Sequence, residues 1–537
     1  MKSVPHPAAA LAVFLATTFC LHVGAQTAAA HPAKAQAAMP ISPAKLDATV
    51  ARAMREFQVP GMAVGIIKDG SLIYAKGYGV REAGKPERVD ADTLFQIGSN
   101  TKAFTSAALA ILVDQGKIHW DDKVIDYLPK FRLYDPYVTR EFTIRDLLTH
   151  RSGLGLGAGD LMFFPPTDLT RDEVMHGLRY LKPVSSFRSK FDYDNLLYMV
   201  AGQIIPAVTG RSWEDFVTQN ILEPLQMGSC AANYERIRDR SDLAAPHVII
   251  DGKPVAIPVA NMDAIGPAGT INCSIDGMSK WLETQLAGGK TPTGRQLFSA
   301  ERGEEMWTMN TITPVDPLLS SLYHTHFTGY ALGWGVGDFL GYKRVGHTGG
   351  VLGTVTWVSM IPELKLGVLV LTNQQSGAAM ESVGNQILDA YLHAPPRDWI
   401  GIAAARERER DSGAKAAEDA AAKVVAAAGP PSLPLAAYAG TYHDPWRGDA
   451  AVRQDGDHLV LEFSRTRYLE GPLMPYSGNT FIVRWNDRGL DADAYVRFEP
   501  GFDGRIQGLT MRAVSPATDF SFDFQDLNFD KVQSPAH

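Results

Sequence analysis

Residues 95–102 read Phe-Gln-Ile-Gly-Ser-Asn-Thr-Lys and lead directly into an apolar pattern with helical spacing. The apolar positions recur every three or four residues and end at a glycine: Phe104, Ala107, Ala108, Ile111, Leu112 and Gly116. This spacing predicts a helix that begins at or near Ser99, with Lys102 three residues on and on the same face. A lysine whose pKa falls on burial can withdraw the proton of a neighbouring serine hydroxyl and so create a nucleophile. Because Ser-x-x-Lys occurs in many helices by chance, a serine N-cap beside a solvated lysine is the alternative.

A second polar stretch, residues 191–195, reads Phe-Asp-Tyr-Asp-Asn. Alternation along an extended turn places Tyr193 and Asn195 on the same side. A phenol near a lysine can act as a base, and an amide can orient the lysine or bind a substrate carbonyl. Taken alone, the stretch fits equally a turn with a partly buried tyrosine.

A third stretch, residues 346–350, reads Gly-His-Thr-Gly-Gly and enters a predicted hairpin. The strands of that hairpin, residues 351–360 and 366–371, flank a Pro-Glu turn. Glycines allow a substrate or another backbone to approach a strand edge closely. An edge N–H beside the N–H of Ser99 would form an oxyanion hole. A glycine bulge with an incidental histidine is the alternative.

Strand signals lie at both ends of a long mixed region, and helical patterns fill its middle. Residues 62–67 and 72–74 surround Asp69-Gly70 and predict a hairpin near the start, which complements the hairpin near residue 360. One antiparallel sheet built from distant segments, together with a helical body, follows from this arrangement. After about residue 433 the chain changes to short strands separated by turn signals, which predicts a small β-barrel or sandwich.

The order and spacing of these stretches, together with residues 143–154 (Thr-Ile-Arg-Asp-Leu-Leu-Thr-His-Arg-Ser-Gly-Leu), resemble the serine β-lactamase and penicillin-binding-protein superfamily. The chain looks most like the branch that holds class C β-lactamases, D-aminopeptidases, D-alanyl-D-alanine carboxypeptidases and related esterases. The resemblance covers about residues 45–395. It implies an α+β fold, an antiparallel sheet with helices on both faces plus a helical subdomain. The tail resembles the lipocalin-like β-barrel that follows this catalytic domain in some members.

The resemblance also implies a role for each matching residue. Ser99 would be the acylated nucleophile, and Lys102 would share its proton. Tyr193 would be the general base, and Asn195 would position Lys102 and a substrate amide. The backbone N–H groups of Ser99 and Gly350 would form the oxyanion hole. The implied mechanism is acylation followed by hydrolysis of the acyl-enzyme, with no metal or cofactor.

One position departs from the penicillin-active members, which usually place a lysine where this chain has His347, the first residue of the substrate-binding triad His347, Thr348 and Gly349. Because histidine is only partly charged near neutral pH, we expect weaker binding of anionic β-lactams and a preference for esters, amides or (D-amino-acid) peptides. The predicted function is therefore an exported serine hydrolase. The alternatives are a class C-like β-lactamase and a non-catalytic ligand- or peptidoglycan-binding receptor. The resemblance treats His150 as part of a helix end and not as a catalytic residue.

Composition narrows the partners. Of the 537 residues, 51 are Lys or Arg and 59 are Asp or Glu, so the net charge is 51 − 59 = −8. This balance, without a basic run, excludes a typical nucleic-acid-binding protein. The expected partner is a small-molecule or short-peptide substrate, and a homo-oligomer is compatible with the sequence. Cys230 and Cys273 can pair in an oxidising compartment, but the sequence does not show that they meet.

The N-terminus is typical of a secretory signal. Lys2 precedes an apolar run from Ala8 to Leu21, which is short for a membrane span, and small residues follow at cleavage positions. We expect a periplasmic or secreted protein with no stable membrane insertion after cleavage. The predicted organisation is a signal peptide at 1–25, a flexible leader at 26–43, the catalytic domain at 44–397, a helical Ala- and Pro-containing linker at 398–432 and the lipocalin-like barrel at 433–537.

Overall fold

An eight-stranded antiparallel sheet joins segments from both ends of the predicted catalytic region. The computed structural model describes residues 39–533, so the predicted signal peptide and most of the leader lie outside the described residues. The strand order is β2-β1-β12-β11-β10-β9-β8-β7. The strands are β1 (Gly61–Lys68), β2 (Ser71–Gly79), β7 (Thr311–Thr313), β8 (Thr328–Tyr330), β9 (Gly335–Phe339), β10 (Tyr342–Val351), β11 (Thr354–Ile361) and β12 (Leu366–Thr372).

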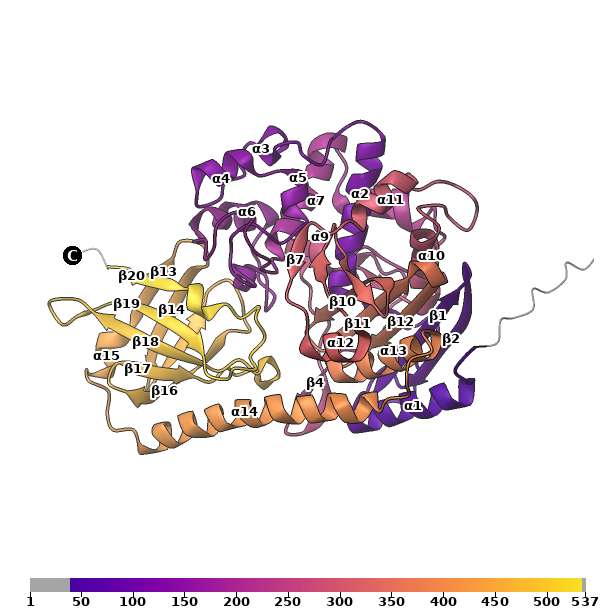
Figure 1. The fold of residues 1–537 in the computed structure, drawn as a ribbon. Coiled ribbons are helices and arrows are strands. Elements are labelled where there is room, and N and C mark those ends of the chain that lie inside the picture. Colours follow the sequence, from indigo (N-terminus) through magenta and orange to yellow (C-terminus); the bar gives the residue numbers. More distant parts are fainter. Residues whose placement is uncertain (1–38, 534–537) are drawn as a thin grey trace, which may run out of the picture. The chain divides into compact units, whose positions relative to one another are not determined.

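Both predicted hairpins are confirmed. β1 and β2 pair across Asp69-Gly70, and β11 and β12 pair across the 3₁₀ turn Pro362–Leu364. β1 also pairs with β12, which joins the first hairpin to the second across about 300 residues (Figure 1). Because β12 is buried along its whole length, its sequence is a nearly continuous apolar run.

Helices cover both faces of this sheet, as the sequence predicted. On one face α1 (Pro43–Glu56), α13 (Gly377–Tyr391) and the start of α14 (Trp399–Ala427) pack against alternate residues of β1 and β12, among them Val64 and Val370. On the other face α2 (Thr101–Asp114) and α10 (Ile275–Leu286) share a core with Ala63 and Leu369.

The remaining helices and two short ladders form the helical subdomain and its connections. The helices are α3 (Val124–Tyr127), α4 (Pro136–Glu141), α5 (Ile144–Leu147), α6 (Arg171–Gly177), α7 (Leu196–Thr209), α8 (Trp213–Val217), α9 (Gly266–Gly269), α11 (Ala300–Met306) and α12 (Pro317–Tyr323). β3 (Phe95–Gln96) pairs with β6 (Asn272–Cys273), and β4 (His247–Ile250) pairs with β5 (Lys253–Ala256).

The C-terminal region is a closed eight-stranded barrel, which decides between the predicted barrel and sandwich. The short helix α15 (Leu435–Tyr438) precedes it. Its strands run in chain order: β13 (Gly440–Asp444), β14 (Gly448–Asp455), β15 (His458–Phe463), β16 (Glu470–Ser477), β17 (Thr480–Val483), β18 (Ala494–Pro500), β19 (Ile506–Ala513) and β20 (Asn528–Lys531). Buried aromatic side chains fill it, among them Tyr442, Phe481 and Phe498.

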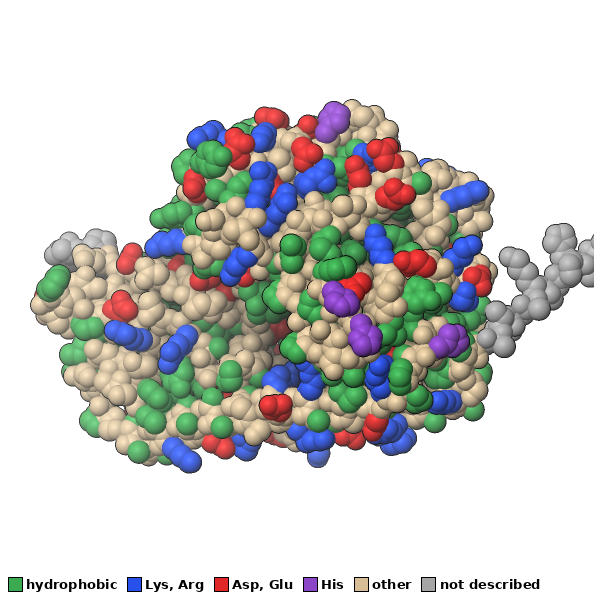
Figure 2. Space-filling model, in the orientation of Figure 1, with side chains coloured by type: hydrophobic (Ala, Val, Ile, Leu, Met, Phe, Trp, Pro, Cys, Tyr) green, Lys and Arg blue, Asp and Glu red, His purple; other side chains and the backbone are tan. Residues whose placement is uncertain are grey.

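Basic and acidic side chains are interspersed over the face drawn in Figure 2 and do not gather by sign. Within residues 39–533, no helix combines the length and apolar character needed to cross a bilayer. The same residues contain no group of three or more His, Cys, Asp or Glu side chains arranged to hold a metal ion.

Candidate active site

Ser99 lies in the 3₁₀ turn Gly98–Asn100, directly before α2, so the predicted position at a helix N-terminus is confirmed. The Lys102 amine donates to Ser99 Oγ at 3.0 Å, which confirms the predicted contact across three residues. Gly98 has a φ of +52°, and a Cβ at this position would collide with the backbone nitrogen of Gly350. The glycine thus fits both the turn and the close approach of another strand.

Lys102 is fully buried, and its amine makes three hydrogen bonds. Besides Ser99 Oγ, it donates to Asn195 Oδ1 at 2.7 Å and to the Ala268 carbonyl at 3.1 Å. Burial lowers the pKa of Lys102 to about 7, although the carboxyl groups of Asp160 and Asp194 oppose this shift. A large fraction of these amines is therefore neutral at physiological pH. The two N–H groups of the neutral form serve Asn195 and Ala268, and its lone pair accepts from the Ser99 hydroxyl.

Tyr193 faces the same amine, since Lys102 Nζ lies 4.7 Å from the centre of its ring. Its hydroxyl is buried and has no aligned hydrogen-bond partner. Burial raises the pKa of Tyr193 well above its usual value. The Ser99 hydroxyl opposes this shift but does not outweigh it. The phenol consequently carries its proton in the resting site. The His150 ring packs 4.2 Å from the Tyr193 ring and accepts a hydrogen bond from the Asp194 backbone N–H, so it supports the tyrosine.

The stretch 346–350 forms the last part of β10, next to the Ser99 turn. β9 pairs with β10 only from Tyr342 to Gly346, so the following residues lack a strand on that side. A Cβ on Gly349 would collide with the Ile97 carbonyl, which explains why only glycine fits there. Thr356 Oγ1 donates to the same carbonyl at 2.9 Å and fixes the turn to the sheet. The turn that carries Ser99 therefore lies directly beside Gly350, whose backbone nitrogen approaches Gly98 closely.

His347 and Thr348 line a cavity of about 340 Å³ that also includes Tyr193 and Tyr330. The Tyr330 hydroxyl and His347 Nε2 are 2.7 Å apart. Burial and the nearby Lys102 lower the pKa of His347 to about 4, although a hydrogen bond to the Thr348 backbone opposes the shift. His347 is therefore neutral near pH 7 and offers no fixed cation to a substrate carboxylate.

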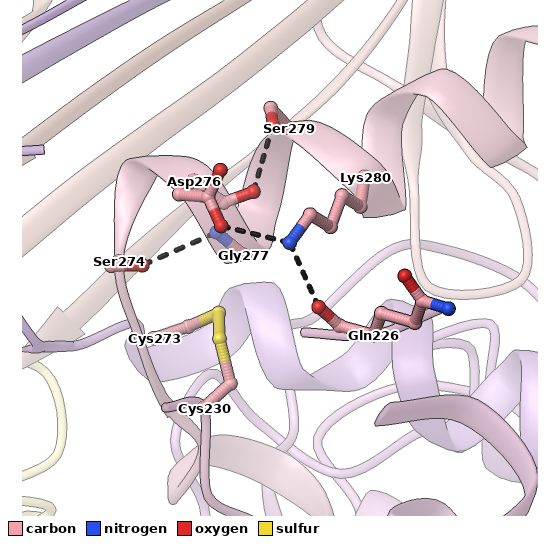
Figure 3. The surroundings of a disulfide bond; sticks show 8 residues. All are labelled: Gln226, Cys230, Cys273, Ser274, Asp276, Gly277, Ser279 and Lys280. Carbon is pink, nitrogen blue, oxygen red and sulfur yellow. Dashed lines mark hydrogen bonds and ion pairs between the residues drawn. A yellow bond between two sulfur atoms is a disulfide. The ribbon is translucent and has the colours of Figure 1, made fainter. Parts of the chain in front are cut away.

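Cys230 and Cys273 form a disulfide, which settles the alternative that the sequence left open (Figure 3). Gly277 makes room for it, since a Cβ there would collide with Cys230 Sγ. Cys273 belongs to β6, whose partner Phe95 opens the segment that carries Ser99. The disulfide therefore braces the ladder directly upstream of the Ser99 turn.

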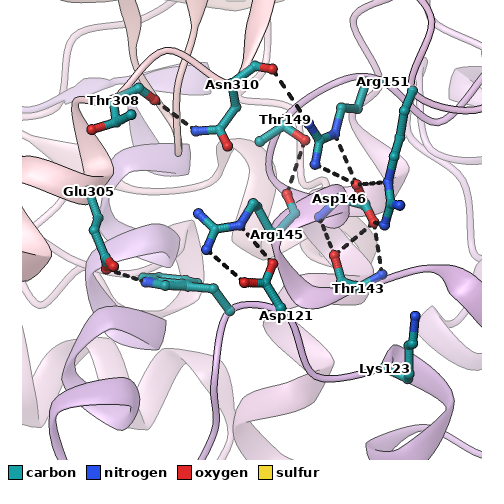
Figure 4. A network of polar contacts seen from close by, with 12 residues as sticks. Asp121, Lys123, Thr143, Arg145, Asp146, Thr149, Arg151, Glu305, Thr308 and Asn310 are labelled. Carbon is teal, nitrogen blue, oxygen red and sulfur yellow. Dashed lines mark hydrogen bonds and ion pairs between the residues drawn. The ribbon is translucent and has the colours of Figure 1, made fainter.

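A network of ion pairs and hydrogen bonds surrounds Asp146 in the helical subdomain (Figure 4). Asp146 is fully buried and accepts hydrogen bonds from Arg151 Nε at 2.9 Å and Arg188 Nη2 at 2.5 Å. It also completes a capping box with Thr143 at the start of α5. This network ties residues 143–151 to Arg188.

Residues 155–166 form a largely apolar loop, and such a loop either lines a substrate site or covers the core. Met162, Phe163 and Phe164 are buried, which favours the cover. The same loop contributes Asp160, a functional neighbour that sequence reasoning missed: Asn195 Nδ2 donates to Asp160 Oδ2 at 2.8 Å. The available signal was a lone acidic residue inside an otherwise apolar loop.

Comparisons with known proteins identify the family of the chain. The family model described as Beta-lactamase matches residues 46–392, and a domain of unknown function, DUF3471, matches residues 425–531. The protein named unguisins hydrolase ungD' of Aspergillus campestris is 29% identical and covers 85% of this chain and 86% of its own. Penicillin-binding protein 4 of Amycolatopsis lactamdurans is 28% identical over 59% of this chain and 82% of its own.

Among solved structures, the octameric penicillin-binding protein homologue from Pyrococcus abyssi aligns with a TM-score of 0.57 and 24% identity. The alignment covers 91% of this chain and 99% of that one, so the likeness extends over both the catalytic region and the barrel. At 24% identity this likeness is evidence for the fold alone.

Proposed function

Because the chain belongs to the Beta-lactamase family of serine hydrolases, we propose that it hydrolyses ester, amide or (D-amino-acid) peptide bonds through an acyl-enzyme on Ser99. One observation carries the proposal: the amine of Lys102, fully buried and with a pKa lowered to about 7, donates to Ser99 Oγ at 3.0 Å. A serine with such a neighbour can lose its proton at neutral pH as it attacks a carbonyl carbon.

The proton movements follow from the pKa directions. As Ser99 Oγ bonds to the substrate carbonyl, its proton passes to the neutral Lys102 amine. The N–H groups of Ser99 and Gly350 stabilise the oxyanion. Since Tyr193 holds its proton at rest, its O–H donates to the leaving group, and the Lys102 ammonium then returns a proton to the phenolate.

Hydrolysis of the acyl-enzyme runs through the same groups in the opposite sense. The neutral Lys102 amine takes the Tyr193 hydroxyl proton while Tyr193 takes a proton from the water whose oxygen attacks the acyl carbonyl. The Lys102 ammonium then protonates Ser99 Oγ as the acyl group leaves. Asn195 holds Lys102 in place through the 2.7 Å hydrogen bond to its amine during both halves of the reaction.

A neutral His347 favours substrates that do not need a carboxylate clamp over anionic β-lactams. The proposed export to the periplasm or the exterior draws support from the Cys230–Cys273 disulfide, because disulfides persist in oxidising compartments. Mass spectrometry of the mature protein tests it: an N-terminus near residue 26 is expected, and an intact Met1 contradicts it.

The decisive experiment is labelling with a fluorophosphonate probe, followed by hydrolysis of p-nitrophenyl esters, D-amino-acid amides and dipeptides. We expect Ser99→Ala to abolish both label and turnover while the melting temperature stays nearly unchanged. Ser152→Ala is the control for loss of a serine hydroxyl in the same subdomain, because the buried Ser152 only accepts a hydrogen bond from the Leu154 backbone N–H. Label on Ser99 without turnover of any substrate would instead favour the receptor alternative.

A β-lactamase assay separates the remaining alternative. Nitrocefin hydrolysis that exceeds ester hydrolysis would favour a class C-like β-lactamase, whereas weak or absent nitrocefin turnover is expected from the neutral His347.

A further inference from the structure

The segment between the last two barrel strands, residues 514–527, contacts the loop that carries Asp160. The carboxyl oxygens of Asp523 accept hydrogen bonds from the backbone N–H groups of Gly159 at 2.6 Å and Leu161 at 3.0 Å. Asp523 is fully buried, and the described residues 39–533 belong to one compact unit. The loop is thus bound at its backbone by a residue more than 360 positions downstream.

The same segment packs beside Tyr193. The Phe520 ring meets the Tyr193 ring edge-on, with 6.1 Å between ring centres. The backbone N–H of Gly157 donates to the Tyr193 carbonyl at 2.9 Å. Gly157 also lies against Phe520, since a Cβ on Gly157 would collide with the Phe520 ring and carbonyl. The barrel segment therefore touches the surroundings of both proposed acid–base groups.

Ser521 makes the most direct link. Its hydroxyl donates to Asp160 Oδ2 at 2.9 Å, and this is the same oxygen that accepts from Asn195 Nδ2 at 2.8 Å. All three side chains are at least nine-tenths buried. From Asn195 the chain of contacts continues to the Lys102 amine, and from there to Ser99 Oγ.

This series of hydrogen bonds reaches Lys102 only in one orientation of the Asn195 amide. The amide presents its oxygen to Lys102 only while its nitrogen has an acceptor on the opposite side, and Asp160 Oδ2 is that acceptor. If the Asp160 carboxyl rotated, the amide could turn its N–H groups toward the amine, where donor would face donor. A second donor on Asp160 Oδ2 holds the carboxyl in the required rotamer.

We propose that the C-terminal barrel completes the catalytic site, with Ser521 as a positioning residue that holds the Lys102 amine against Ser99 through Asp160 and Asn195. The inference rests on the proposed function and assigns a role to the barrel within it. The barrel then acts on the rate of acylation as well as on the stability of the fold.

The test compares Ser521→Ala with Ser515→Ala in the full-length chain. Both serines are 8% exposed and lie on the same segment, but the Ser515 hydroxyl accepts only from the Ala517 backbone N–H. Each variant is measured for the second-order rate of fluorophosphonate labelling, for kcat and KM on an ester, and for melting temperature. Ser521→Thr, which keeps the hydroxyl, is the rescue variant.

We expect Ser521→Ala to lower the labelling rate and kcat by about fivefold, the effect of one hydrogen bond, with KM little changed. Ser515→Ala should stay within about twofold of wild type on the same scale, and Ser521→Thr should recover most of the rate. In an Asn195→Ala background the Ser521 substitution should have no further effect, because the connection to Lys102 is already broken.

The proposal is wrong if Ser521→Ala and Ser515→Ala label at the same rate, or if the two losses at 521 and 195 simply multiply. Should Ser521→Ala not fold, Ser521→Thr and Ser521→Cys in wild-type and Asn195→Ala backgrounds carry the same comparison. Failure of the proposed function looks different, because wild-type protein itself would then not be labelled at Ser99.

Discussion

Two buried carboxyl groups in the helical subdomain, Asp146 and Asp160, have opposite surroundings. Both are fully buried. Burial raises the pKa of each, but hydrogen bonds from Arg188 and Thr143 and the charge of Arg151 outweigh it at Asp146 and lower the pKa there. Within the described part of the chain no cation lies within hydrogen-bond distance of Asp160. Burial, together with the charge of Asp523, raises its pKa well above the usual value.

The difference shows what separates a structural polar cluster from a reactive one. In the Asp146 region two guanidinium groups compensate the negative charge of one buried carboxylate. The Asp160 region instead gathers groups whose charged forms are disfavoured by burial, including Lys102 and Tyr193. Perturbed pKa values of this kind concentrate where proton transfer takes place.

The largest effect is expected in the reactive region. Lys102→Met keeps the length of the side chain but removes the proton acceptor, so the labelling rate of Ser99 should fall about 10³-fold. Because the lost group was buried, the melting temperature should be unchanged or higher. Labelling rate and thermal unfolding are the measurements. Lys123→Met, in a partly exposed ion pair with Glu141, is the matched control and should label at the wild-type rate.

The comparison breaks down if Lys102→Met labels as fast as wild type, since another base would then serve Ser99.

In the Asp146 region a substitution should change stability and leave the labelling rate unaffected. Asp146→Asn leaves Arg151 and Arg188 without their shared carboxylate, so the free energy of unfolding should fall by about 3 kcal/mol. Labelling per folded molecule should be unaffected. Denaturant unfolding of this variant is compared with Asp121→Asn, which breaks an ion pair of Asp121 that is largely exposed and should cost at most about 1 kcal/mol.

Equal losses for Asp146→Asn and Asp121→Asn would show that the buried network contributes no more than a surface ion pair.

The sequence predicted one side of this contrast well. Helical geometry was enough to place Lys102 on the same face as Ser99. Tyr193 and Asn195 were joined to this pair only through the resemblance to the family. The two hairpins were equally local, since each is marked by its own turn.

The different surroundings of the two carboxyl groups could not be predicted from the sequence, for a physical reason. Asp146 and Asp160 look alike in the sequence, and what distinguishes them is the partners brought by tertiary packing, Arg188 in one case and Ser521 in the other. Ser521 and Asp523 alternate with phenylalanines, a pattern typical of a strand, yet residues 519–526 form turns that point both polar groups at the Asp160 loop. A periodicity of two gives no sign of such a partner.

A smaller effect should appear in the pH dependence of labelling. The neutral amine of Lys102 is the active form, and its pKa is about 7, so the rate should rise about tenfold per pH unit below 7 and level off above 8. In their ionised forms Asp160 and Asp194 would oppose the lowered pKa of Lys102, but burial outweighs them. Labelling rates from about pH 5 to pH 9 test it, with Lys102→Met as the control that should lose the step.

A rate that stays level through pH 7 in folded protein would mean that the amine is not the group whose deprotonation limits acylation.

The smallest effect is expected from the substitution that matches Asp146→Asn most closely. Because the raised pKa of Asp160 already favours its uncharged form, Asp160→Asn replaces one neutral group by another of the same shape. The amide oxygen can accept from both Asn195 and Ser521, as Oδ2 does now. The free energy of unfolding should change by less than about 1 kcal/mol, or rise, in denaturant titrations at neutral pH. A loss as large as that of Asp146→Asn would mean that Asp160 is a stabilised anion, and the contrast between the two carboxyl groups would disappear.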